Sequence, residues 1–218
     1  MVTQAMETTK NYRIILSTAY LPNVQYFTKL LHGTVALEQH ENYLKQTYRN
    51  RCEILTANGV MSLSIPVKHC APKIKIRDVR IDYTDDWQKI HRRTIISAYG
   101  SSPFFEYYAD DLLPFYEKKE EFLFDFNRNL LNTLLELTSI RADICLSGSY
   151  THDYDRDYRT SINPKTKLND PCFTVVPYYQ VFGSKFAFQP NLSILDLLCS
   201  EGNNTYSILK QSTVNGER

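Results

Sequence analysis

The sequence predicts an α/β fold: a mixed sheet with an N-terminal β-α-β unit, a central β-hairpin and flanking helices. Three observations predict it: a strand–helix–strand pattern over residues 14–38, a hairpin pattern over residues 52–67, and apolar helical stripes further along. A hydrophobic content of 43% beside 22% charged residues is typical of a packed globular protein. We expect one domain over residues 12–218 and a disordered extension over residues 1–11, where no apolar pattern occurs.

The first elements alternate between strand and helix. An apolar run at residues 14–16 predicts a strand, and residues 22–33, opened by proline and ended by glycine, carry apolar residues at helical spacing. The β-rich stretch 34–38 predicts a second strand, and such units build parallel sheets that bind ligands at the carboxyl ends of their strands. The first loop, residues 17–21, contains no glycine. It therefore holds neither a G-x-G-x-x-G turn nor a P-loop, and no cofactor is indicated.

The hairpin is the clearest local pattern. Residues 52–57 and 60–67 flank Asn58-Gly59, a dipeptide suited to the positive φ angles of a two-residue turn. In the second arm apolar residues alternate with polar or small ones, which is the period of a strand with one buried face. We therefore place a β-hairpin here.

Helices are predicted from about Asp85 to Tyr99 and from about Phe115 to Leu137, where leucine and phenylalanine recur on one stripe. A strand is expected at residues 144–146. The polar stretch 151–171 then contains almost no apolar residue, and we predict that it is a mobile lid over the site. The alternative is an idle surface loop.

Charge and cysteine content exclude several classes of protein. Lys and Arg number 25 against 24 Asp and Glu, so no overall field recruits nucleic acid, and no nucleic-acid motif occurs. Five cysteines at wide spacings without C-x-x-C argue against a disulfide framework and a zinc site, so we expect no metal and reduced thiols in the cytoplasm. No apolar run is long enough to span a membrane.

His91 is the first candidate for chemistry. Trp87, His91 and Ile95 share one face of the predicted helix, so the imidazole lies beside the only tryptophan. An imidazole in that setting can be tuned for proton transfer near neutral pH. The alternative is a buried histidine that only satisfies a backbone carbonyl.

A second candidate region is the stretch 38–52, which gathers polar side chains after a predicted strand. Arg49 and Arg51 offer planar guanidinium groups for phosphate or carboxylate, and Asn42 and Tyr43 suit hydroxyl-rich ligands. The alternatives are a solvated connection and the front of the hairpin strand. The candidate binding residues here are His40, Asn42, Tyr43, Arg49, Asn50 and Arg51.

Several short motifs, taken in order, are similar to those of a known family. They are Tyr20-Leu21-Pro22 with Gln25-Tyr26-Phe27, Asn42-Tyr43 with Tyr48-Arg49-Asn50-Arg51, Ser64-Ile65-Pro66-Val67, Trp87 and His91 with Tyr99, Pro103-Phe104-Phe105, and Leu192-Ser193-Ile194-Leu195-Asp196-Leu197-Leu198. The sequence resembles the WbqC-like proteins over nearly its whole length.

The resemblance implies a cytoplasmic α/β protein of bacterial surface-polysaccharide (O-antigen) or envelope biosynthesis, with acyl or aminoacyl transfer to an amino sugar. It adds Tyr20, Gln25 and Trp87 to the binding residues, and Asp196 as a catalytic partner that orients His91. Gln39-His40 departs from the pattern, since many members are acidic there, and this departure speaks against a carboxylate-based or metal-based reaction.

Two hypotheses follow. In the first, an enzyme uses Arg49, Asn50 and Arg51 to hold the phosphate or carboxylate of a nucleotide-linked sugar or other phosphorylated small molecule, while His91 moves a proton. In the second, a non-catalytic binding or adaptor protein serves an envelope-assembly system through its tyrosine-rich loops. The first predicts that His91, Trp87, Asn50 and Arg51 converge on one cleft. The sequence specifies no oligomeric state.

Overall fold

Four parallel strands form the central sheet of the computed structural model, which describes residues 14–69, 71–165 and 170–214. The predicted extension at residues 1–11 lies outside the described residues. The strand order is β5-β2-β1-β6, and every neighbouring pair is parallel. The strands are β1 (Ile14–Ser17), β2 (Thr34–Glu38), β5 (Asp143–Leu146) and β6 (Arg156–Asp157).

The N-terminal β-α-β unit is confirmed. Helix α1 (Val24–Leu30) joins β1 to β2, and the Asn23 side chain caps it by accepting from the Tyr26 backbone N–H. Every residue of α1 is buried, including Lys29. A helix with polar residues usually exposes one face to solvent. Because α1 is covered on all sides, its polar side chains must form their contacts inside the protein.

The hairpin is confirmed, with a one-residue correction at its tip. Strands β3 (Arg51–Thr56) and β4 (Gly59–Ser64) pair antiparallel, and Thr56 lies opposite Gly59. The tip is therefore Ala57-Asn58, and Gly59 follows it with a φ of +100°. A turn followed by a glycine of positive φ is the other common hairpin tip, and it leaves Asn58 without the positive φ that the sequence analysis assigned to it.

The helices match the prediction in part. Helix α2 agrees with the predicted 85–99 helix, but the predicted 115–137 helix starts later, because Leu123 donates its backbone N–H to Val79 and Glu121 accepts from Ile81. These bonds hold the preceding stretch extended. The α-helices after α1 are α2 (Trp87–Tyr99), α3 (Phe105–Leu112), α4 (Leu123–Leu137), α5 (Ile194–Glu201) and α6 (Thr205–Gln211).

The 151–171 stretch is not loop throughout. Strand β6 lies within it and pairs with β1, so Arg156 aligns with Ile14 and Asp157 with Ile15. Ile162 is buried in the core beyond it. The polar composition of this stretch indicated a loop without core residues, but its middle part packs against β1 and the core.

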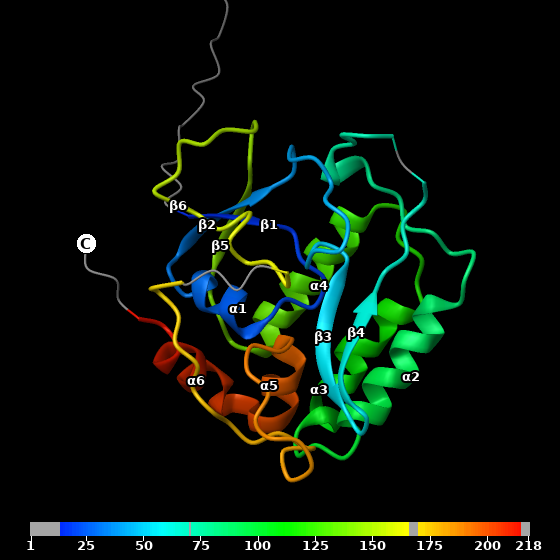
Figure 1. Ribbon diagram of the computed structural model, residues 1–218, viewed down its shortest axis with the longest axis vertical. Coiled ribbons are helices and arrows are strands. Elements are labelled where there is room, and N and C mark those ends of the chain that lie inside the picture. Colours follow the sequence, from blue (N-terminus) through cyan, green and yellow to red (C-terminus); the bar gives the residue numbers. More distant parts are fainter. Residues whose placement is uncertain (1–13, 70, 166–169, 215–218) are drawn as a thin grey trace, which may run out of the picture.

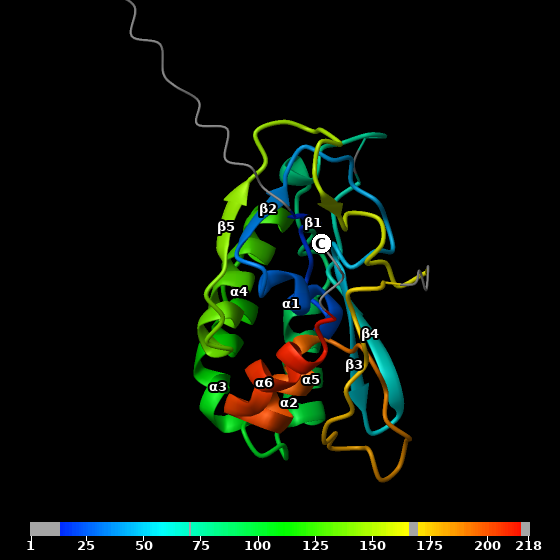
Figure 2. The same ribbon diagram turned by 90° about the vertical axis from the view of Figure 1, so that its left-hand side faces the viewer.

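The sheet and the helices occupy different parts of the molecule. The sheet lies in the upper part of Figure 1, and α3, α5 and α6 gather in the lower part. In this view the hairpin runs down the middle, between α5 and α2. In the perpendicular view of Figure 2, β5 and the hairpin lie on opposite sides of the molecule. The inner face of the hairpin packs on the helices, which leaves its outer face toward the 170–192 segment.

Candidate functional site

The carboxyl ends of the parallel strands are the first place to look for a site. The chain moves from β1 to β2 on one side of β1 and later to β6 on the other side, so the strand order reverses between β1 and β6. Open α/β sheets bind ligands in the crevice at such a reversal. Ser17 ends β1 at this point, and the residues just after Asp157 lie beside it.

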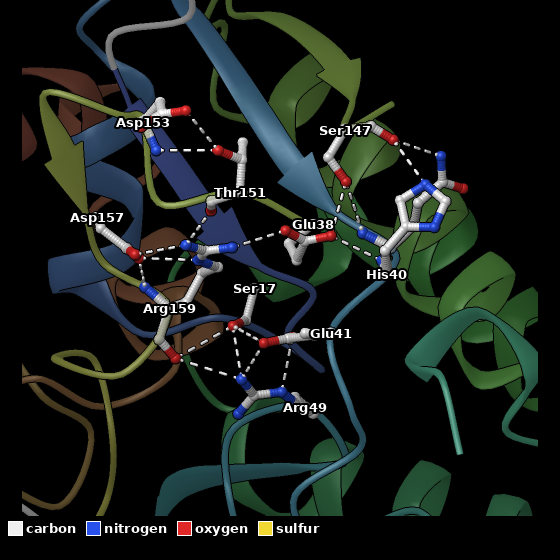
Figure 3. Close-up of polar contacts among 11 residues, drawn as sticks. Ser17, Glu38, His40, Glu41, Arg49, Ser147, Thr151, Asp153, Asp157 and Arg159 are labelled. Carbon is white, nitrogen blue, oxygen red and sulfur yellow. Dashed lines mark hydrogen bonds and ion pairs between the residues drawn. The ribbon is translucent and has the colours of Figure 1, made fainter. Parts of the chain in front are cut away.

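The protein fills this crevice with its own side chains. Arg159 is 3% exposed, and its Nη1 donates to Glu38 Oε2 at 2.8 Å while its Nη2 donates to Asp157 Oδ2 at 2.6 Å (Figure 3). The other oxygen of Glu38 accepts from the Ser147 hydroxyl at 2.7 Å. The Tyr150 ring lies against the Arg159 guanidinium, with 4.4 Å from the ring centroid to Cζ.

A second ion pair lies beside the first. Arg49 Nε donates to Glu41 Oε1 at 2.8 Å, and Arg49 Nη2 donates to Glu41 Oε2 and to Ser17 Oγ (Figure 3). The backbone carbonyl of Arg159 accepts from Ser17 Oγ at 3.2 Å and so joins the two pairs. Because carboxylates already neutralise both guanidinium groups, Arg49 is not presented to a ligand as the sequence analysis expected.

The remaining space at the crevice is small. A cavity of about 10 Å³ lies between Ser17, Tyr26, Tyr48 and Tyr158, enough for about one water molecule. We therefore place the candidate site outside the crevice. Sequence reasoning missed Glu38, Glu41 and Arg159; the one available signal was that Glu38 ends a buried strand with a charge.

A groove runs beside the crevice, along the outer face of the hairpin. This acidic groove has a volume of about 500 Å³. It contains the predicted binding residue Gln25. Its other polar lining residues are Tyr48, Glu53, Ser161, Asn163, Asp170, Gln189 and Asn191, and Val60, Phe173, Val175 and Leu192 supply apolar surface.

One wall of the acidic groove is held rigidly from behind. Gln25 Nε2 donates to Asp170 Oδ2 at 2.8 Å, and Asn191 Nδ2 donates to Gln25 Oε1 at 3.1 Å. Lys29 Nζ also lies 2.6 Å from Asp170 Oδ2. Burial raises the pKa of Asp170, but the hydrogen bonds from Gln25 and Lys29 outweigh it, and the pKa is lowered overall. Asp170 is thus a fixed anion whose oxygens are already occupied.

Two further residues of the acidic groove, Glu53 and Ser161, carry polar side-chain atoms without a protein partner among the described residues. Within the described ranges, Glu53 forms no ion pair, and Ser161 Oγ is buried without a hydrogen-bond partner. The Glu53 backbone carbonyl accepts from Ser193 N at 2.8 Å, which fixes this part of β3 against the start of α5. A carboxylate and a hydroxyl left without partners at a groove are suited to a cationic, hydroxylated ligand.

A basic groove of about 320 Å³ lies at the start of β3. Tyr43, Asn50 and Arg51, three of the predicted binding residues, line it together with Lys45 and Ser64. Arg51 Nε donates to Ser64 Oγ at 3.4 Å, and Asn50 Nδ2 donates to the Ile65 carbonyl at 2.8 Å. The structure therefore brings these three predicted residues together.

His91 and Trp87 do not join them. His91 is 4% exposed, its Nδ1 lies 2.9 Å from the Tyr20 hydroxyl, and that hydroxyl lies 2.8 Å from the Tyr116 hydroxyl. Burial lowers the pKa of His91 to about 4, against a smaller opposite effect of its hydrogen bond to the Ser64 backbone. Trp87 packs edge-on against the imidazole in the core. The predicted convergence of His91 and Trp87 with Asn50 and Arg51 on one cleft is absent, because the apolar face of α2 turns both rings inward.

Asp196 is buried at 1% exposure, but its partners are not His91. Asp196 Oδ2 accepts from the Tyr178 hydroxyl at 2.9 Å and from Gln180 Nε2 at 2.7 Å. Burial raises the pKa of Asp196 to about 6, and these hydrogen bonds oppose the rise. The predicted pairing of Asp196 with His91 is thus not found, since Asp196 faces the 178–180 turn.

The two other predicted residues serve local contacts. His40 Nε2 lies 3.1 Å from the Ser147 carbonyl, next to the Glu38 network (Figure 3). Asn42 is exposed and accepts from Lys75 Nζ at 3.2 Å. Among the described residues no group of three or more His, Cys, Asp or Glu side chains could hold a metal ion, and no helix there could cross a bilayer.

The fold is that of an α/β protein with a parallel sheet and a separate hairpin. A model of the WbqC-like protein family matches residues 18–172, well over half of the chain, so the chain belongs to this family. It is also similar to an uncharacterised protein, Rv1507c, of Mycobacterium tuberculosis, with 31% identity over 139 residues. That alignment covers 62% of this chain and 60% of the relative, so the chain spans less than two thirds of the relative's length. No solved structure matches the chain.

Proposed function

We propose that this protein binds an amino sugar in the acidic groove and transfers an acyl or aminoacyl group to the sugar amine, in bacterial surface-polysaccharide or envelope biosynthesis. A cytoplasmic location, expected from the thiol content, is part of the proposal. One observation carries it: within the described residues, Glu53 presents a carboxylate without an ion-pair partner to a groove that is also lined by Asp170, amides, hydroxyls and a few apolar side chains. Ring-shaped, hydroxylated cations fit that lining.

The lining also disfavours the other ligand classes. Glu53 and Asp170 make the acidic groove repel phosphate, while a neutral sugar would leave the Glu53 carboxylate without a cation. Apolar ligands would remove water from the Glu53 carboxylate without giving it a hydrogen bond. A sugar that carries an amine can pair its ammonium with the Glu53 carboxylate and hydrogen-bond its hydroxyls to the polar side chains of the groove.

The transfer needs no protein nucleophile. The sugar binds as its ammonium form and first releases one proton to solvent through Glu53, which frees the nitrogen lone pair. The neutral amine then attacks the carbonyl carbon of an acyl thioester, a C–N bond forms, and the C–S bond breaks. The amine loses a proton to Glu53, and the leaving thiolate receives it, so the products are an amide and a thiol. Glu53 acts as general base here, a role for which Asp170 is unsuited because its oxygens already accept hydrogen bonds from Gln25 Nε2 and Cys172 N.

The test compares ligands that differ only at the amine. We expect glucosamine to bind more tightly than glucose or N-acetylglucosamine in calorimetric titrations. Glu53→Gln should weaken glucosamine binding about tenfold, as expected for a lost ion pair with a bound cation, and Glu106→Gln, an exposed change on α3, should have no effect. Thiol release from an acyl-coenzyme A in the presence of glucosamine then measures transfer. Equal binding of glucosamine and glucose would refute the proposal.

One observation favours the adaptor hypothesis instead. Both predicted catalytic residues, His91 and Asp196, are sealed in the core, while Tyr107 on α3 is 75% exposed and Ile90 on α2 is 57% exposed. Exposed apolar side chains on adjacent helices suit a protein partner. An adaptor predicts that Tyr107→Ser and Ile90→Ser abolish partner binding and leave the sugar titrations unchanged.

A further inference from the structure

We infer that the basic groove is an anion subsite of the same ligand, so that the substrate is an amino sugar that carries a phosphate near its amine. This inference rests on the proposed function and extends it from the acidic groove to the basic groove. It assigns Arg51 to the phosphate and leaves Glu53 for the amine.

The register of the hairpin places the two charges in line. Side chains alternate along a strand, so Arg51 and Glu53 of β3 share one face, about 7 Å apart along the strand. The same face of β4 presents Ser64 opposite Arg51 and Ser62 opposite Glu53. Cys52 and Ile54, on the other face, are buried in the core. The outer face of the hairpin is therefore a polar strip with a cation at one position and an anion at the next.

Tyr48 lies close enough to Arg51 and Glu53 to feel both charges. It lines the acidic groove, yet its hydroxyl responds to charges in both grooves: after burial, Glu53 raises and Arg51 lowers its pKa, which reaches about 12. The phenol therefore stays protonated at neutral pH and remains a hydrogen-bond donor or acceptor between the two charged positions.

The basic groove has the chemistry of a phosphate site. Arg51 and Lys45 line it, and among the described residues neither forms an ion pair with a carboxylate. In contrast, Arg49 and Arg159 are each neutralised by a carboxylate in the crevice. Within the described part of the chain, the Arg51 side chain donates only to the Ser64 hydroxyl, at 3.4 Å, so its Nη groups are available for a planar, two-point contact with phosphate oxygens.

The spacing selects a ligand with both charges on one sugar. In a 2-amino sugar 1-phosphate the amine and the phosphate sit on neighbouring ring carbons, a separation that the length of the Arg51 side chain can match. The phosphate can come from a sugar 1-phosphate or from a nucleotide-linked sugar, which share this chemistry. We name the shared class, an amino sugar with an anomeric phosphate.

The experiment varies the amine and the phosphate of the ligand independently and combines each ligand with changes at Arg51 and Glu53. Glucosamine 1-phosphate, glucosamine, glucose 1-phosphate and glucose are titrated into the wild type, Arg51→Gln and Glu53→Gln, with Arg93→Gln as the control for an exposed arginine on α2. We expect the phosphate to tighten glucosamine binding at least tenfold in the wild type and the control. Arg51→Gln should remove this gain and leave glucosamine binding itself unchanged. Far-ultraviolet circular dichroism verifies that each variant is folded.

The outcomes separate the two proposals. If glucosamine binds through Glu53 but the phosphate adds nothing, or if Arg51→Gln keeps the gain, the anion subsite is refuted and the amino-sugar site stands. If glucose 1-phosphate binds through Arg51 as tightly as glucosamine 1-phosphate, the amine has no role; the anion subsite stands and the proposed function falls. Titration with uridine diphosphate glucosamine assigns the source of the phosphate by whether the nucleotide tightens binding further.

Discussion

The Lys29 ammonium lies 2.6 Å from Asp170 Oδ2 inside the protein, with both side chains almost fully buried. Lys29 belongs to α1 and Asp170 to the segment that follows β6, so this ion pair ties the Asp170 side of the acidic groove to the first β-α-β unit. The Tyr158 ring lies 4.7 Å from Lys29 Nζ and covers the same charge. The groove wall is therefore fixed by an interaction between residues far apart in the sequence.

Removal of one partner of this pair should destabilise the protein strongly. Lys29→Met leaves the Asp170 carboxylate buried without its cation, and we expect a loss of about 3 kcal/mol in the free energy of unfolding. Urea denaturation measures this loss, with Lys89→Met, an exposed change on α2, as the control. The double change Lys29→Met with Asp170→Leu should recover part of the loss, because no charge then remains unpaired. A loss below about 1 kcal/mol for Lys29→Met would contradict this account.

His91 should make the fold sensitive to mild acid. Its pKa is about 4 in the folded protein and about 6.5 when unfolded, so between these values the unfolded state binds more protons. Its contribution to stability is complete above pH 6.5 and falls by about 3 kcal/mol as the pH drops to 4. The measurement is the stability difference between wild type and His91→Gln at pH 7 and at pH 4.5. A difference that does not change with pH would show that His91 is not held neutral.

Asp196 should have the opposite effect. Burial raises its pKa to about 6, above its unfolded value, so the folded state binds more protons and stability is lost as the pH rises through this range. Asp196→Asn keeps an oxygen for Tyr178 and Gln180 and carries no charge. We expect this variant to be roughly 1–2 kcal/mol more stable than wild type at pH 8 and no more stable at pH 4. Thermal unfolding at the two pH values decides it, and a variant that is less stable at both would contradict the prediction.

Arg159 should be essential to the fold rather than to binding alone. Arg159→Ala leaves Glu38 buried without a cation and removes the guanidinium that holds Asp157, so we expect a loss of about 3–5 kcal/mol. Arg128→Ala, which breaks an exposed ion pair with Asp125 on α4, should change stability by less than about 0.5 kcal/mol. Chemical denaturation of both variants makes the comparison. Similar small losses would show that the buried network contributes little.

The lid prediction now applies to a shorter segment. Arg159 and Asp170 pin the two ends of a stretch whose residues Ser161, Asn163 and Pro164 line the acidic groove. We expect backbone hydrogen exchange at residues 160–165 to be faster than in the hairpin and to slow when glucosamine binds. Unchanged exchange on ligand binding would identify an idle loop. Deletion of residues 154–167 would not test the lid cleanly, because it also removes β6 and Arg159.

Local patterns predicted the elements whose formation depends on near neighbours. The β-α-β unit, the hairpin and α2 follow from apolar period and turn residues, and the predicted face of α2 correctly turned His91 toward Trp87. The family resemblance named Gln25, Asn50 and Arg51, which the structure places in grooves. Strand β6 could not be predicted, because its two residues gain their strand conformation only by pairing with β1.

The sequence by itself determined that this chain is an α/β domain of a particular family, because apolar periodicity and short motifs are local properties. Only the tertiary structure decided which charges are free. Arg49 and Arg51 are equivalent in the sequence, two residues apart, but Glu41 neutralises the first and the second faces a groove. Coulombic pairing depends on the distance between groups that the fold brings together, and no sequence pattern encodes that distance directly.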